Sequence, residues 1–244
     1  MIDLHFHCLP GIDDGPRDWN EAVALCRAAA ADGTGTIVAT PHVLREIWIN
    51  DDPKHRSELL LKLNTLLSGK PAFLAGCEYF FSSDAVELWE LGASGPLVGL
   101  NRGSALLVEF PANHVPACAE AVFHEFSLLG VTPVIAHPER NIVFTRDVER
   151  LQSLVARGAA TQITAGSLVG EFGKIARDAC EEFFRLGLVH VVASDAHSVA
   201  RRPPRLSAAR ERVRRDWGSD AEVAFFETNP AALVHSGSLA GSVR

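Results

Sequence analysis

Residues 1–15 read MIDLHFHCLPGIDDG, in which a short apolar strand pattern ends in two histidines. His5 and His7 are two positions apart, so both side chains point to the same side of an extended strand. Asp13 and Asp14 follow in a loop that contains proline and glycine. The stretch therefore predicts that groups able to bind metal ions lie at the point where a buried strand stops.

The same pattern of a short apolar run followed by a longer amphipathic segment repeats along the chain. The predicted strands are Ile2–His5, Thr36–Thr40, Ala72–Cys77, Ala105–Phe110, Thr132–Ala136, Ala160–Ile163 and Val189–Ala193. The predicted helices cover about 18–32, 52–69, 116–130, 146–158, 167–187 and 204–217, and Asp18 with Glu21 resembles a capping box for the first.

This alternation predicts a parallel sheet with right-handed crossovers. Closed on itself, such a sheet is an α/β barrel, here slightly short of eight units, and we expect a single domain over residues 1–244. An open doubly wound sheet is the alternative, and the absence of a glycine-rich dinucleotide turn disfavours it. We expect the small, polar tail 236–244 to be disordered.

Charge and cysteine content exclude several classes of protein. The formal net charge is -7, from 23 basic and 30 acidic side chains, which disfavours a nucleic-acid binder. The five cysteines form no CxxC pair, which favours reduced thiols in a cytoplasmic protein. The sequence shows no signal peptide and no apolar run near the ~20 residues that a membrane helix needs, so we expect no membrane insertion.

Histidines and carboxylates recur at the ends of the predicted strands. They are His5, His7, Asp14, His42, Glu78, Glu109, His137, Asp195 and His197. Because the carboxyl ends of barrel strands converge on one mouth, we expect these side chains to lie together. So many ionisable groups in one crevice require cations to neutralise the carboxylates. Mixed nitrogen and oxygen ligands favour manganese, iron or zinc over calcium, and their number suits two or three ions.

Each motif alone also has a purely structural interpretation. A strand-end histidine pair can be incidental, Glu139 and Arg140 can pair on the surface of a turn, and Asp195 can cap a helix. Histidines and carboxylates that were unrelated to one another would not all occur at the same end of consecutive strands, so their common position favours a metal site. The remaining histidines have no such support and are interpreted as structural: His55, His114, His124, His190 and His235.

The motifs resemble the PHP (polymerase and histidinol phosphatase) superfamily. Within it, they are similar to the bacterial manganese-dependent protein-tyrosine phosphatases of capsular and exopolysaccharide loci. The resemblance rests on LPGIDDG (9–15), ATPH (39–42), AHPER (136–140), AGSL (165–168) and ASDAH (193–197), which span most of the chain. LPGIDDG together with AHPER makes it specific.

The resemblance implies a distorted (β/α)7 barrel, similar to a TIM barrel, with a ligand set for three metal ions and a phosphate-binding pair. His5, His7, Glu78 and Asp195 would hold one ion; Glu78 would bridge to a second, held with Glu109 and His137; Asp14, His42 and His197 would hold the third. Arg140 and Arg202 would bind phosphate, with Arg201 as the alternative to Arg202, since arginine offers a planar fork to such oxygens. Asp195 and His197 would join these arginines in the catalytic set.

The chain departs from the family pattern in one loop. Val43 stands where the family often has a second histidine, and the segment Leu44–Asp52 differs from the expected loop containing Asn and Tyr. Thr164 replaces the Asn of a later motif. Substrate contacts in the loop therefore cannot be carried over from the family.

The leading functional hypothesis is hydrolysis of phosphotyrosine in a protein by a hydroxide that bridges metal ions. The cysteine-based route needs Cys-x5-Arg, which none of the five cysteines provides. The alternatives are a small-molecule phosphatase, for example for histidinol phosphate, and a non-catalytic metal-binding regulatory module. The resemblance implies a membrane-associated tyrosine kinase of polysaccharide export as partner and leaves a homo-oligomer open. Tyr79 is the only tyrosine, which excludes self-regulation through a tyrosine cluster.

Overall fold

The computed structural model describes residues 1–239, so the last five residues of the predicted polar tail lie outside the described part. The strands are β1 (Ile2–Phe6), β2 (Thr36–Ala39), β3 (His42–Val43), β4 (Ala72–Ala75), β5 (Glu78–Phe80), β6 (Ala105–Glu109), β7 (Thr132–Ala136), β8 (Ala160–Thr164) and β9 (Val191–Ala193). All paired strands run parallel, in the orders β1-β2-β4 and β3-β5-β6-β7-β8-β9.

Two of the predicted strands, Thr36–Thr40 and Ala72–Cys77, are each followed after a short break by a second short strand that was not predicted, β3 and β5. Pro41, which has no N–H to donate, separates β2 from β3. Gly76 lies between β4 and β5, and a Cβ there would be 3.0 Å from Val38 Cγ1 and 3.3 Å from Leu100 Cδ2. The two breaks fall side by side, because β2 pairs with β4 and β3 pairs with β5. They distort the barrel but leave its order unchanged.

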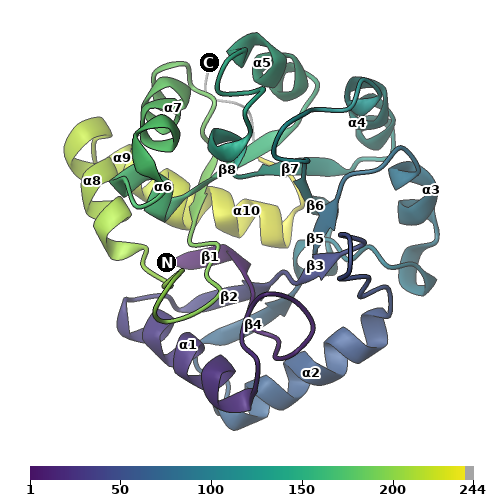
Figure 1. Ribbon diagram of the computed structural model, residues 1–244, viewed down its shortest axis with the longest axis vertical. Helices are drawn as coiled ribbons and strands as arrows, with labels where there is room; N and C mark the ends of the chain where they lie inside the picture. Colours follow the sequence, from purple (N-terminus) through teal and green to yellow (C-terminus); the bar gives the residue numbers. More distant parts are fainter. Residues whose placement is uncertain (240–244) are drawn as a thin grey trace.

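Backbone hydrogen bonds between the first and last strands close the barrel. Asp195 N–H donates to His5 O at 2.9 Å, and His7 N–H donates to Ala196 O at 3.0 Å. Figure 1 shows the ring of strands with most of the helices around its outside. The predicted distorted (β/α)7 barrel is therefore confirmed, and the open doubly wound alternative is excluded.

A bulge in β1 directs its histidines toward the barrel mouth. Asp3 pairs with Ile37 and Phe6 pairs with Ala39, so three steps along β1 match two along β2. Leu4 packs in the barrel interior, whereas Phe6 packs outside against the α1 side. The bulge lets Leu4 and His5 both face inward, which simple alternation would not allow.

The helices are α1 (Trp19–Ala31), α2 (Pro53–Leu66), α3 (Ala85–Glu90), α4 (Ala119–Leu128), α5 (Val148–Ala156), α6 (Ala165–Val169), α7 (Gly173–Arg185), α8 (Ser207–Trp217), α9 (Ser219–Val223) and α10 (Asn229–His235). Shorter helical turns are η1 (Gly92–Ser94), η2 (Leu100–Arg102), η3 (Pro138–Arg140) and η4 (Ala224–Thr228).

Several helices differ from the predictions. The single helix predicted over 167–187 is two helices, because Gly170 adopts a left-handed φ of 93° that ends α6. Asp18 caps α1 as expected, but Glu21 binds the backbone N–H of Arg17 instead of completing a capping box. The helices α3, α9 and α10 were not predicted.

Helix α10 closes the bottom of the barrel, at the end opposite the metal-binding motifs. Its Leu233 and Val234 pack with interior residues of the strands, among them Leu4, Val38 and Val191. The Asn229 side chain donates to His190 O, just before β9, at 2.9 Å. Figure 1 shows α10 crossing the middle of the ring. It excludes water from the lower half of the interior, beneath the polar site.

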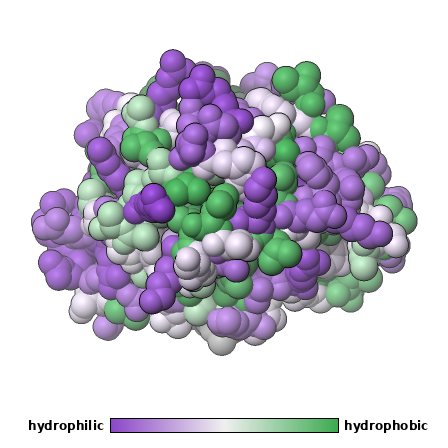
Figure 2. All heavy atoms as spheres, turned by 90° about the horizontal axis from the view of Figure 1, so that it is seen from below, coloured by the Kyte–Doolittle hydropathy of each residue, from purple (hydrophilic) through white to green (hydrophobic). Residues whose placement is uncertain are grey.

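The outer surface is mixed in polarity. Figure 2 shows the face on the side of α1 and α2, where apolar side chains lie among polar ones. On α2, Leu61 and Leu66 are 67% and 46% exposed. Within residues 1–239, no helix combines the length and the apolar character required to cross a bilayer.

We predict that Leu233→Ala lowers the free energy of unfolding by about 2–4 kcal/mol, because it opens a cavity under the barrel where Leu233 is fully buried. Leu61→Ala is the matched control and should change stability by less than about 0.5 kcal/mol. Urea unfolding followed by circular dichroism measures both. Equal effects would show that α10 does not seal the interior.

Candidate metal centre

The structure brings together every side chain that the sequence placed at a strand end. Their elements surround one mouth: His5 and His7 come from the end of β1, Asp14 from the following loop, His42 from β3, Glu78 from β5, Glu109 from β6, His137 from after β7, and Asp195 and His197 from after β9. All except Asp14 and His137 are buried. The groups that are distant in sequence form one cluster.

Glu78 is the hub of this cluster. Its Oε1 lies 3.0 Å from His137 Nε2 and 3.3 Å from His5 Nε2. Its Oε2 lies 2.7 Å from His42 Nδ1 and 3.4 Å from His7 Nε2. Both oxygens are therefore shared between histidines on different strands, as expected of a carboxylate that bridges two cations.

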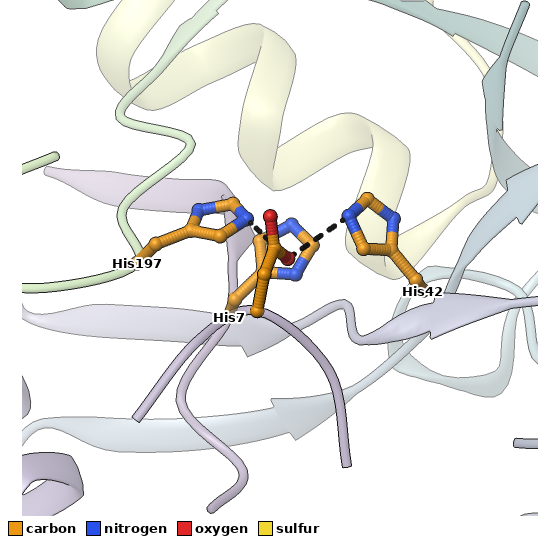
Figure 3. Close-up of side chains that lie close together, drawn as sticks. His7, His42 and His197 are labelled. Atoms are coloured by element: carbon orange, nitrogen blue, oxygen red, sulfur yellow. Dashed lines mark ion pairs between the residues drawn. The ribbon is translucent and has the colours of Figure 1, made fainter. Parts of the chain in front are cut away.

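Asp14 joins the histidines on the other side of the cluster. Its Oδ1 lies 3.1 Å from His197 Nε2 and 3.2 Å from His42 Nε2, the two contacts dashed in Figure 3. The rings of His7 and His197 stack with their centroids 3.8 Å apart. The close-up shows these histidines converging from separate parts of the chain.

Asp195 links the cluster to two arginines. Its Oδ1 lies 3.2 Å from His5 Nε2, and its Oδ2 accepts hydrogen bonds from Arg140 and Arg202. Burial would raise the pKa of Asp195, but Arg140, His5 and Arg202 hold that pKa well below its usual range. The carboxylate therefore stays charged while it is fully buried.

The backbone is strained at two of these positions. His137 has a φ of 33° and Asp195 a φ of 53°, in the left-handed region that side chains with a Cβ rarely occupy. Such strain costs on the order of 1–3 kcal/mol and is typically retained where it positions functional groups. Here it turns both side chains into the mouth as their strands end.

Two residues that the predicted ligand set omits orient the first pair of histidines. Asp13 Oδ2 lies 2.9 Å from His7 Nδ1, and Gln162 Oε1 lies 2.8 Å from His5 Nδ1. If Nδ1–H donates in both rings, the Nε2 lone pairs face the cluster, an arrangement typical of metal-binding histidines. Asp13 was noted only as a loop residue, and the one signal for Gln162 is a polar side chain inside an apolar strand.

The protein's own charges divide the histidines into two kinds. Burial lowers the pKa of His5 and His42, but Glu78 and the other nearby carboxylates raise it to about 9 and about 10. Burial and Arg140 lower the pKa of His137 to about 3, and burial and His7 lower that of His197 to about 4. The buried carboxylates therefore favour positive charge beside His5 and His42.

The carboxyl group of Glu109 also lies in surroundings that disfavour its negative charge. Burial and the neighbouring Glu78 raise its pKa to about 8. Arg45 is close by, with Nε 3.2 Å from Glu109 Oε2. The Arg45 guanidinium lowers this pKa but does not offset the effects of burial and of repulsion by Glu78. A divalent cation between the two carboxylates would do so.

The donor set fits metal ions. Within residues 1–239, several buried site atoms lie close to one another but form no hydrogen bond, among them His42 Nδ1, Glu78 Oε2, Glu109 Oε2 and His197 Nε2. His5 Nε2 and His7 Nε2 lie 3.1 Å apart. When two nitrogens bind the same ion at about 2.1 Å, they are roughly 3 Å apart, so this spacing suits one ion held by both histidines.

Four overlapping groups of ligand atoms are close enough to hold an ion. They are His7, Asp14, His42 and His197; His5, His137 and Asp195; His5, His7 and Glu78; and His42, Glu78 and Glu109. The first matches the third predicted ion with His7 added. Two histidines lie about equally close to Glu109: His42 Nδ1 is 3.7 Å from its Oε2, and His137 Nε2 is 3.9 Å from its Oε1. Either histidine could therefore complete the ligands of an ion held by Glu78 and Glu109.

A cavity of about 230 Å³ opens onto the cluster. Three arginines line it, namely Arg45, Arg140 and Arg202, together with the aromatic rings of Phe110 and Phe144. Arg202 reaches Asp195, whereas Arg201 is exposed and lines a neighbouring hollow. Arg45 was not predicted, because it lies in the loop where the chain departs from the family pattern.

The five histidines that were interpreted as structural stay outside the cluster. His55 and His124 lie in α2 and α4, as expected, and His235 ends α10. His190 Nδ1 accepts a hydrogen bond from the Thr161 N–H at 3.2 Å. Burial lowers the pKa of His190 to about 4, which keeps its ring neutral. This histidine connects β8 to the start of β9.

An α/β barrel with histidines and carboxylates at one mouth, beside an arginine-lined cavity, defines a metal-dependent hydrolase. The model of the family "Capsular polysaccharide synthesis, CpsB/CapC" matches residues 1–235, and the chain belongs to this family. The tyrosine-protein phosphatase YwqE of Bacillus subtilis is 38% identical, with 96% of this chain and 91% of YwqE covered. The tyrosine-protein phosphatase CpsB of Streptococcus pneumoniae is 28% identical, with 96% and 98% covered.

Solved structures agree with this assignment. A crystal structure from work on YwqE and CpsB, described as unique metal-dependent tyrosine phosphatases, has a TM-score of 0.91 at 35% identity and covers 99% of this chain and 96% of the other. An organophosphorus hydrolase from Deinococcus radiodurans has a TM-score of 0.59 at 13% identity, with 94% and 91% covered. That second likeness shows the barrel fold alone.

We predict that Glu78→Ala weakens metal binding by more than about 100-fold, because both oxygens of the hub carboxylate are lost. Elemental analysis of the purified protein measures bound metal, and circular dichroism checks that the barrel is intact. Glu87→Ala, an exposed carboxylate on α3, is the control and should keep the wild-type content. A folded Glu78 variant with full metal content would contradict the role of Glu78.

Proposed function

We propose that this chain is a metal-dependent protein-tyrosine phosphatase, which hydrolyses phosphotyrosine in a protein linked to capsule or exopolysaccharide synthesis. The observation that carries the proposal is the position of Arg140 and Arg202. Both bind Asp195 within the cluster and line the cavity above it. A phosphate in that cavity would contact the arginines while it faces the histidines and carboxylates.

The residues that would hold the ions are those of the predicted set. Two or three divalent ions, manganese first and iron or zinc as alternatives, suit the mixed nitrogen and oxygen donors. Bound there, such ions would polarise the phosphoryl group and lower the pKa of water near it. The partition of ligands implied by the family resemblance remains a proposal.

The chain's own residues position and stabilise the substrate. The planar guanidinium groups of Arg140 and Arg202 suit two oxygens of the phosphate, where charge is spread in the transition state. Asp195 contacts both arginines and His5, so it fixes the position of the phosphate-binding arginines relative to the histidine and carboxylate cluster. Phe110 and Phe144 supply an apolar wall on which the phenyl ring of the substrate can pack.

The proposal includes a cellular setting. The substrate is a phosphotyrosine protein, for which a bacterial tyrosine kinase of polysaccharide export is the expected source, and the location is the cytoplasm. The absence of disulfides supports this location, since all five cysteines are free. A homo-oligomer is compatible with this setting.

We predict that chelation abolishes turnover of a phosphotyrosine peptide and that added manganese restores it. The reason is that, within residues 1–239, no cysteine lines the cavity, and the arginines there cannot activate water as a divalent ion does. Release of phosphate is measured with the peptide and, in parallel, with histidinol phosphate. Full activity after chelation, or a strong preference for histidinol phosphate, would contradict the proposal.

We predict that Arg202→Ala lowers kcat/KM by roughly 10²–10³-fold, because one charged donor to the transferring phosphoryl group is removed. Arg201→Ala is the matched control, since its side chain is exposed and points to another hollow. Steady-state kinetics on the phosphotyrosine peptide compares the two variants, with metal content measured in each. Equal losses in both variants would show that the phosphate site lies elsewhere.

A further inference from the structure

The loop between β3 and α2, residues 44–52, forms a tight turn at the rim of the cavity. Arg45 and Trp48 pair in antiparallel fashion, with Arg45 N donating to Trp48 O at 3.1 Å and Trp48 N donating to Arg45 O at 2.7 Å. The Asn50 side chain donates to His42 O at 2.8 Å and to Ile12 O at 2.9 Å. The turn is therefore fastened to the strand and to the loop that carry His42 and Asp14.

The backbone of this turn is strained. Leu44, Glu46 and Asn50 have φ values of 56°, 47° and 42°, all in the left-handed region. Such angles are unfavourable for residues with a Cβ and persist only where the surroundings enforce them. Buried Arg56 does so here, since it donates to Asn50 O and, at 2.6 Å, to Pro96 O. The fold holds the turn in one conformation.

The strained turn fixes the side chain of Arg45 on the wall of the cavity. Its Cζ lies 5.6 Å from the ring centroid of Trp48 and 5.9 Å from that of Phe80. Its Nε lies 3.2 Å from Glu109 Oε2, and its Nη1 lies 2.6 Å from His42 Nε2. Two aromatic rings and two site residues thus hold a guanidinium whose side chain is 27% exposed.

Arg45 shares a feature with the two arginines already assigned to phosphate. Among residues 1–239, the Nε atoms of Arg45, Arg140 and Arg202 are all buried and form no hydrogen bond, although Arg45 Nε lies 3.2 Å from Glu109 Oε2 in an ion pair. A buried N–H that forms no hydrogen bond is unfavourable, and a well-placed ligand oxygen would satisfy it. Arg140 and Arg202 approach from the Asp195 side, whereas Arg45 approaches from the Glu109 side.

We propose that Arg45 is a third substrate-binding arginine, which contacts the phosphate of the substrate from the side opposite Arg140 and Arg202. This inference rests on the proposed function, because it assumes a phosphomonoester in the cavity. Three guanidinium groups around one phosphate match its several oxygens and its two negative charges. The chain supplies this group from the loop in which it departs from the family pattern.

The test compares Arg45→Gln and Arg45→Lys with the wild-type protein loaded with manganese. The inhibition constant of inorganic phosphate and the KM for p-nitrophenyl phosphate are measured, together with metal content. We expect both constants to rise roughly tenfold or more in Arg45→Gln, with metal content unchanged. Arg45→Lys should recover part of the loss, because it restores the charge without the planar fork.

The control is Arg17→Gln, which removes an exposed arginine paired with Glu21 and should leave both constants unchanged. Unaltered constants in Arg45→Gln would overturn the inference and leave Arg45 as a partner of Glu109 alone. A loss of metal from Arg45→Gln would also overturn it, since Arg45 would then act through the ligands. If phosphate binding depends on Arg45 while the wild type leaves phosphotyrosine peptide intact, the proposed function fails and this inference stands.

Discussion

The structure depends on the burial of several carboxylates that share the same histidines as neighbours. Glu78, Glu109 and Asp195 are withdrawn from water in a space that they share with five imidazole rings. Isolated charges in such a place are costly, so the cluster is stable only when positive charge is supplied in several directions. The arginines supply it from the rim, and the geometry of the ring nitrogens suits cations at the centre. The barrel strands, their breaks and the strained strand ends all serve to hold this arrangement.

Much of this arrangement could be predicted because the relevant residues lie at strand ends. His5, His7 and His137 follow apolar runs, and the predicted bounds of Thr132–Ala136 agree with β7. Parallel strands place such residues at one mouth whatever their separation in sequence. Other features depend on contacts that a single sequence does not encode locally. The bulge in β1, the orientation of His5 by Gln162 and the short helix α10 are of this kind, since each is stabilised by a partner far along the chain.

Arg45 shows a further limit of reasoning from motifs. It lies in a segment without a recognised pattern, and its position depends on left-handed backbone angles that no sequence rule predicts for leucine or glutamate. The contacts that enforce those angles come from Asn50 and Arg56, which are unremarkable in the sequence. A family motif fixes what members share. The groups that distinguish one member can therefore lie just beyond it, on the same cavity.

The hydrogen bonds that join β1 to β9 have a consequence for the order of assembly. His5 and Asp195 are held side by side, although the whole series of crossover units separates them in sequence. During synthesis, β1 emerges from the ribosome long before β9 has been made. His5 and His7 therefore lack Asp195 as a neighbour until the end of translation. No nascent fragment that lacks β9 contains the full ligand set. The ligand set is therefore completed only when the last strand joins the first and the barrel closes.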